Sequence, residues 1–147
     1  MKPFILAAAL AAAAATTAFA DGMVSYSTED SFEDVVFGLE NAILDQGLVI
    51  DAVSHVGEML ERTRADVGSN VTIFTHADVY SFCSANLSRK VMEADPMNIR
   101  FCPYDIFVAV QPDTGKTTIG YREFPDGPMQ EVQALVDTIT RAAIGMD

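Results

Sequence analysis

Apolar and polar residues follow two rhythms along the chain, one typical of strands and the other of helices. Short runs rich in β-branched and aromatic residues predict strands over residues 23–27, 48–53, 104–111 and 117–122. Between the first two runs, apolar residues recur every three or four positions, after a cap at Ser27 or Thr28 and before Gly47. This predicted helix would bury one face, made of Phe32, Val35, Val36, Leu39, Ile43 and Leu44.

Three more helices are expected further along the chain. The first would be short and cover residues 56–63, and the second would run over residues 84–94. The last would begin at Pro128 and bury the stripe formed by Val132, Leu135, Val136, Ile139 and Ala143. Residues 71–82 are again rich in β-branched and aromatic residues, and we expect a strand there through about Thr75.

A tight turn is expected at residues 112–115, Pro-Asp-Thr-Gly, because these residue types favour turn conformations. The strands on either side would then pair as an antiparallel hairpin. The hairpin predicts an α+β fold: a single domain with a mixed or antiparallel sheet and helices packed on it. The alternative is a doubly wound parallel sheet, but residues 25–31 lack the glycine-rich first turn of that fold.

The first twenty residues resemble a secretory signal peptide. They combine a basic start at Lys2, an apolar run over residues 4–15 and a small-residue site, Ala-Phe-Ala, that ends at Ala20. A transmembrane anchor is the alternative, but it needs about 20 apolar residues and basic flanks. We therefore expect cleavage between Ala20 and Asp21, a mature domain of residues 21–147, and a periplasmic or secreted location.

The mature chain would be strongly acidic. The whole chain has 9 Lys and Arg residues against 21 Asp and Glu residues, and loss of Lys2 leaves 8 against 21, a formal net charge of −13. Charge of this sign repels phosphate backbones and anionic lipid surfaces. We expect no nucleic-acid partner and no stable membrane insertion. The partner would be an unknown small ligand or a periplasmic protein.

Cys83 and Cys102 are the only cysteines in the chain, and three interpretations of them remain open. Export to an oxidising compartment favours a disulfide, which would close a loop of about twenty residues and add about 3 kcal/mol of stability. Alternatively, Cys83 at a predicted helix N-terminus would have a lowered thiol pKa and act as a reactive thiolate. The third alternative is two separate buried thiols. We expect the two residues to lie close together, because a short return over residues 96–101 can bring the chain back beside the start of its helix.

His76 is the histidine nearest to Cys83 in the sequence. One histidine and two cysteines suit a soft metal such as copper, with Met92 or Met97 as a fourth ligand, and the same set could hold haem. This spacing matches no established ligand pattern. The alternative is that His76 lies on the polar side of a strand and that His55 is a solvated residue at the start of a helix.

No motif in the chain assigns a catalytic residue or a cofactor. CxxC, CxxCH, a P-loop, GxSxG and HExxH are all absent from the sequence. Acidic pairs at residues 29–30 and 33–34 are typical of the first turn of a helix, where they interact favourably with its dipole.

Three segments carry a family resemblance: Phe-Cys-Ser-Ala-Asn-Leu-Ser-Arg-Lys over residues 82–90, Ala-Asp-Pro-Met-Asn-Ile-Arg-Phe-Cys-Pro-Tyr over residues 94–104, and Gly-Tyr-Arg over residues 120–122. Together they resemble the family called domain of unknown function 302, specifically its exported proteobacterial members. The resemblance covers nearly all of the mature chain and implies a compact α+β domain similar to the TATA-binding-protein-like layout. It implies no activity and no catalytic residues.

These observations lead to three hypotheses about function. The first is an exported binding or accessory domain without catalysis of its own. The second is a thiol-dependent redox or sulfur-transfer protein that uses Cys83 and Cys102. The third is a soft-metal or haem carrier that uses both cysteines and His76.

Overall fold

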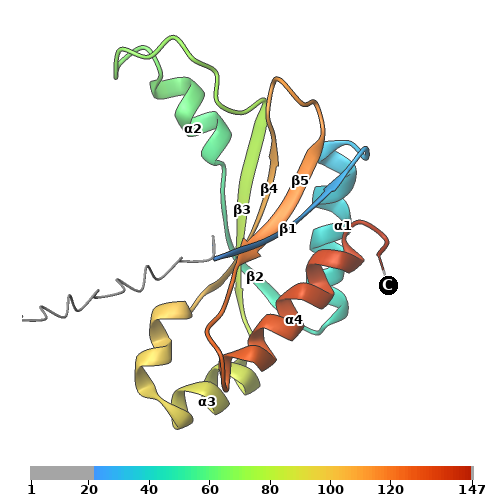
Figure 1. The fold of residues 1–147 in the computed structure, drawn as a ribbon, viewed down its shortest axis with the longest axis vertical. Coiled ribbons are helices and arrows are strands. Elements are labelled where there is room, and N and C mark those ends of the chain that lie inside the picture. Colours follow the sequence, from blue (N-terminus) through green and yellow to red (C-terminus); the bar gives the residue numbers. More distant parts are fainter. Residues whose placement is uncertain (1–21, 147) are drawn as a thin grey trace, which may run out of the picture.

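The computed structural model describes residues 22–146, so the expected leader peptide and its cleavage point between Ala20 and Asp21 lie outside the described residues. Figure 1 shows the chain as one sheet with helices beside it and beyond its ends. The elements are, in order, β1 (Met23–Thr28), α1 (Phe32–Asp45), β2 (Val49–Ser54), α2 (Val56–Thr63), β3 (His76–Cys83), α3 (Ala85–Ala94), the 3₁₀ helix η1 (Pro96–Phe101), β4 (Tyr104–Val110), β5 (Thr117–Arg122) and α4 (Met129–Ala142). The predicted order of strands and helices is therefore confirmed.

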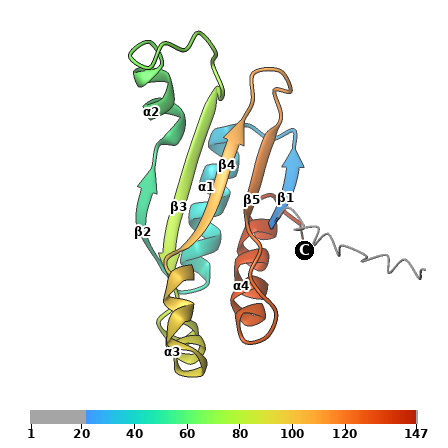
Figure 2. The ribbon, with the colours of Figure 1, turned by 60° about the vertical axis from the view of Figure 1, so that its left-hand side comes forward.

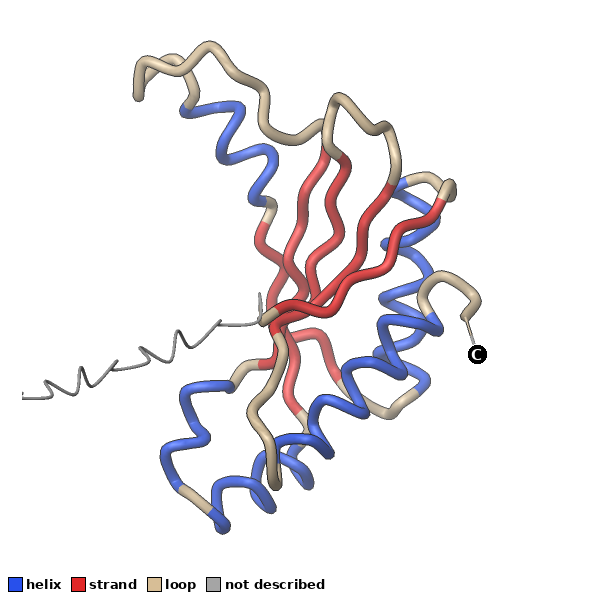
Figure 3. The backbone as a smooth tube through the Cα atoms, in the orientation of Figure 1, coloured by secondary structure: helices blue, strands red, loops and turns tan. Residues whose placement is uncertain are grey.

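The sheet is antiparallel throughout and has the strand order β1-β5-β4-β3-β2. Helices α1 and α4 cover one face, and Figure 2 shows both of them behind the strands. Helix α2 projects beyond the end of the sheet where β3 begins, and α3 with η1 lies beyond the end where β3 finishes (Figure 3). This arrangement confirms the α+β class and the prediction of helices packed on one sheet.

The core lies between the sheet and the two covering helices. Alternate residues of β4 are buried, as expected for a strand with one face against helices. Val108 of β4 and Leu39 of α1 are both fully buried, which confirms the predicted inward faces. Helix α4 contributes Val132, Val136 and Ile139 to the same core.

Two predicted boundaries were wrong. Helix α1 is capped by Ser31, whose Oγ accepts a hydrogen bond from the Asp34 amide at 3.1 Å, because Ser27 and Thr28 belong to β1. The third strand begins at His76, after the segment where we expected it. Its ladder with β4 starts at the pair His76–Val110, so residues 71–75 lie beyond the end of their neighbour strand.

Candidate functional site

The structure brings Cys83 and Cys102 together, as predicted. Cys83 is the last residue of β3, and Cys102 follows η1 just before β4. Helix α3 leads the chain away from the sheet and η1 leads it back. The two Sγ atoms are 3.1 Å apart, and the peptide bond between Cys102 and Pro103 is cis.

The two sulfur atoms, called the sulfur pair below, are thiols in this structure, because a covalent S–S bond measures about 2.05 Å. The pair continues into a short chain of polar contacts. Ser88 Oγ lies 3.4 Å from Cys102 Sγ and 2.9 Å from the hydroxyl oxygen of Tyr104. Tyr104 is buried, whereas both cysteines are half-buried. The sulfur pair therefore lies at the boundary between the core and the surface.

The environment of Cys83 favours the neutral thiol. Burial, and after it the contact with Cys102, raises the pKa of Cys83 to about 11, although a backbone hydrogen bond at Tyr104 acts in the opposite direction. The alternative of a thiol pKa lowered by a helix N-terminus is not supported. Cys83 belongs to β3, and the cap of α3 is Ser84, whose Oγ accepts a hydrogen bond from the Leu87 amide at 3.4 Å. The cost of burying a charged sulfur is the largest cause of the raised pKa.

His76 does not join the sulfur pair. His76 and Cys83 are the first and last residues of β3, and seven residue steps at about 3.3 Å each separate them by about 23 Å. The expected ligand set of two cysteines and His76 is therefore not brought together. Among residues 22–146, no group of three or more His, Cys, Asp and Glu side chains is placed to hold a metal ion.

His76 instead lies in a cleft at the opposite end of β3, called the α2 cleft below. It has a volume of ≈ 970 Å³ and lies between α2, the segment 72–75 and the start of β3. Its walls include aromatic and titratable side chains, those of Phe32, His55, Glu58, Phe74, His76 and Asp78. The rings of Phe32 and His76 are stacked, with centroids 5.0 Å apart and planes 22° from parallel.

A histidine–aspartate pair forms another part of the wall. His55 Nδ1 lies 2.9 Å from Asp78 Oδ1, and His55 is the N-cap residue of α2 without a side-chain capping bond. The hydrogen bond with Asp78 raises the pKa of His55, and the nearby charge of Glu58 adds to this effect. The hydrogen bond engages Nδ1 of His55 and orients the imidazole ring beside the cleft.

Sequence reasoning missed the α2 cleft, because its walls come from four separate parts of the chain. His55 and Asp78 are joined only by the packing of α2 against β3. Gly57 makes this close approach possible, since a Cβ there would lie 2.7 Å from the backbone nitrogen of Ala77. The one local signal was Gly57 near the start of a predicted helix, where glycine is otherwise unfavourable.

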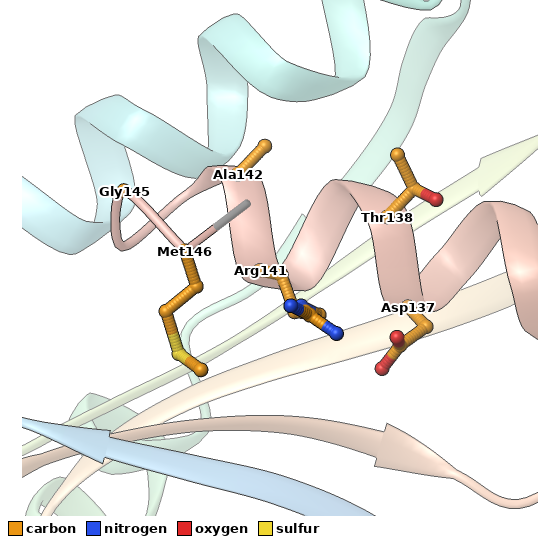
Figure 4. A pocket seen from close by; sticks show the side chains of 6 residues that line it. All are labelled: Asp137, Thr138, Arg141, Ala142, Gly145 and Met146. Carbon is orange, nitrogen blue, oxygen red and sulfur yellow. The ribbon is translucent and has the colours of Figure 1, made fainter.

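A third polar cluster holds α4 on the sheet. The hydroxyls of Tyr26 in β1 and Tyr121 in β5 both donate to Asp137 Oδ1, at 2.6 and 2.9 Å. Figure 4 shows Asp137 and Arg141 on the side of α4 that faces β1 and β5, beside a hollow of ≈ 470 Å³. The shared carboxylate ties three elements together, so we interpret this cluster as structural.

The comparisons with known proteins support the fold and give no activity. The family model described as Domain of unknown function DUF302 matches residues 24–137. A crystal structure of an uncharacterized conserved DUF302 protein from Bacillus stearothermophilus is similar to this chain, with a TM-score of 0.59 and 16% sequence identity over 85% of this chain and 89% of that one. No curated protein matches the chain. None of the helices in residues 22–146 has the length and apolar character needed to span a membrane.

Proposed function

The chain belongs to the DUF302 family, whose description assigns no activity, and from the geometry of the chain itself we propose an exported binding domain that acts through the α2 cleft without catalysis of its own. The observation that carries the proposal is the cleft itself. At ≈ 970 Å³ it has the size of a small-molecule site and about twice the volume of the hollow beside Asp137, ≈ 470 Å³.

The walls of the α2 cleft are held in place before any ligand arrives. The Phe32–His76 stack joins the start of α1 to β3, and the His55–Asp78 pair joins α2 to β3. A site whose side chains are already fixed loses little conformational entropy on binding. This supports a role in recognition.

The sulfur pair favours a scaffold role over thiol catalysis. A thiol with a pKa of about 11 is almost entirely protonated at neutral pH, and the protonated form is a poor nucleophile. We propose that after export the thiols of Cys83 and Cys102 form a disulfide by exchange with a disulfide of an exported thiol oxidase. Two thiols and that disulfide give the Cys83–Cys102 bond and two oxidant thiols.

The mass of the exported protein tests maturation and the disulfide together. We expect a chain that begins at Asp21, with a mass two hydrogens below that of the reduced form and no thiol that reacts after unfolding without reductant. The Cys83→Ser/Cys102→Ser variant is the control and should show no mass difference on reduction. Retention of Met1 would contradict processing. Two free thiols in freshly exported protein would contradict the disulfide.

A thiol-dependent redox or sulfur-transfer function is the second candidate, and one observation favours it. The sulfur atoms are only 3.1 Å apart and half-buried, so a small movement would form or open a disulfide. In this function one of the two cysteines would attack the substrate disulfide and the other would resolve the mixed disulfide. Reduction of a model disulfide with turnover, lost in Cys102→Ser, would support this function over the binding domain. A soft-metal or haem carrier gains no such support, because His76 lies at the other end of β3.

Benzyl alcohol, a neutral aromatic probe, tests the α2 cleft as a binding site. Titration into ¹⁵N-labelled mature protein should shift amide signals near His55, Phe74 and His76 in a saturable way. The variant Phe32→Leu should weaken these shifts, and Phe37→Leu, which changes an exposed ring on the same helix, should leave them unchanged. Saturable shifts confined to residues away from the α2 cleft, or no saturable shifts at all, would contradict the proposed site.

A further inference from the structure

The α2 cleft combines aromatic faces with an excess of negative charge. Phe32, Phe74 and His76 supply rings on its walls. Three carboxylates, those of Glu58, Glu61 and Asp78, line the same space, and Arg62 is the one Lys or Arg side chain among its lining residues. The cleft is therefore net negative whether His55 is neutral or protonated.

The three carboxylates differ in their partners. Asp78 is paired with His55, and Glu61 forms an ion pair with Arg64 at 3.1 Å. Within residues 22–146, Glu58 makes no hydrogen bond or ion pair with another side chain. Its carboxylate is thus available to a ligand, one helical turn before Arg62 on α2.

The whole chain adds to this local field. Its acidic and basic residues give a formal net charge of −12, which becomes −13 after loss of Lys2. A cleft lined by charge of the same sign as the whole protein concentrates counter-ions near its mouth. Small cations would therefore be enriched at the α2 cleft and small anions depleted.

We propose that the α2 cleft selects organic cations, meaning an ammonium group carried on an aromatic or apolar body. This inference rests on the proposed binding function and names its ligand class. The apolar body would lie against the Phe32–His76 stack and Phe74, and the ammonium would lie near Glu58. Aromatic faces attract cations as well as apolar groups, so the two halves of the ligand reinforce one another.

Three probes that share a benzene ring separate charge from ring contact. Benzyltrimethylammonium carries a positive charge, benzyl alcohol is neutral and benzoate carries a negative charge. At neutral pH and low salt, the amide shifts of the α2 cleft should show the highest affinity for the cation, a lower one for the alcohol and the lowest for benzoate. The cation should bind about tenfold more tightly than the anion, and added salt should reduce the difference, because these charges are partly exposed.

A matched pair of variants locates the charge that matters. Glu58→Gln should weaken binding of the cation about two- to fivefold and leave benzyl alcohol unchanged. Asp45→Asn removes the same charge from the far end of α1 and should leave both unchanged. Equal loss in the two variants would mean that only the net charge acts, and it would overturn the role of Glu58.

The outcomes separate this inference from the function on which it rests. Cleft shifts with benzyl alcohol, together with equal or stronger binding of benzoate than of the cation, would overturn the ligand class and leave the binding site standing. Cleft shifts with none of the three probes would overturn both. Preference for the cation, reduced by Glu58→Gln, supports both.

Discussion

At the scale of single residues, burial governs the chemistry of the sulfur pair. Cys83 ends a strand on the edge of the core, and the neutral sulfur is favoured there because the charged form would lose hydration. The same residue looked reactive in the sequence, since the next residue begins a helix. Sequence order shows which residues are neighbours but not how much water reaches them.

The raised pKa of Cys83 predicts slow alkylation of the reduced protein at neutral pH. The rate of iodoacetamide labelling at Cys83, followed by mass spectrometry of its peptide, should rise with a midpoint near 11. In Cys102→Ser the midpoint should fall and still lie above the ordinary value of about 8.5, because burial is the larger cause. A midpoint at or below the ordinary thiol value in the reduced native protein would show that the sulfur is charged at rest.

The same shift has a consequence for stability, whose sign follows from linkage. The folded pKa lies above the unfolded one, so the folded state holds the proton more tightly. This contribution to the stability of the reduced protein is complete below the ordinary thiol pKa and is lost as the pH rises toward about 11. Denaturant unfolding of the Cys83→Ser variant should show a smaller loss over the same pH range, and the remaining loss would come from buried tyrosines such as Tyr104, whose pKa burial also raises.

At the scale of elements, the position of α2 decides whether the α2 cleft exists. The helix meets the rest of the fold mainly at the start of β3, through Gly57 and the His55–Asp78 pair. Its eight residues are too few to be stable in isolation, so its order depends on this contact. At the opposite end of the sheet, the sulfur pair connects the end of β3 to the residue that follows η1.

Gly57→Ala should therefore loosen α2. The added Cβ would meet the backbone nitrogen of Ala77 at 2.7 Å, and crowding of this kind typically costs about 1–3 kcal/mol. Amide hydrogen exchange should become faster in α2, while the amides of β4 keep their protection. Glu58→Ala, at the next and exposed position of the same helix, is the control and should leave exchange in α2 close to that of the parent protein. Equal exchange in the two variants would contradict the close contact.

At the scale of the whole molecule, hydrophobic periodicity predicted the order of the elements but not their pairing. The hairpin of β4 and β5 was predictable, because residues 112–115 form a tight turn between two apolar runs. The pairing of β1 with β5 joins the two ends of the domain, and no local signal contains it. The segment 71–75 has the residue types of a strand, yet its neighbour strand ends before it.

Of the two candidate sites, one was predictable from the sequence and the other was not. The approach of Cys83 and Cys102 was predictable, because one helix and one short return separate them and their lengths limit the gap. The α2 cleft was not, because Phe32, His55 and Asp78 meet only through tertiary packing. Residue type and nearness in the sequence suggested that His76 belonged with the cysteines, and the length of β3 keeps them apart.

Because the helices and the sheet share one core, shortening a buried side chain in either of them should lower the stability of the whole domain. Leu39→Ala in α1 and Val108→Ala in β4 should each lower the free energy of unfolding by about 1–4 kcal/mol, with valine at the lower end. Phe37→Ala, at an exposed position of α1, should change it by less than about 0.5 kcal/mol. Denaturant unfolding gives all three values, and losses within error at both buried sites would contradict the assigned core.

A crystal structure of residues 21–147 soaked with benzyltrimethylammonium tests the central claim most directly, because it shows where a ligand of the proposed class lies. We predict density for the ring against Phe32 and His76 and for the ammonium beside Glu58, with the Glu58→Gln crystal showing lower occupancy. Density for the probe only at other surfaces, with the α2 cleft filled by solvent alone, would contradict the claim.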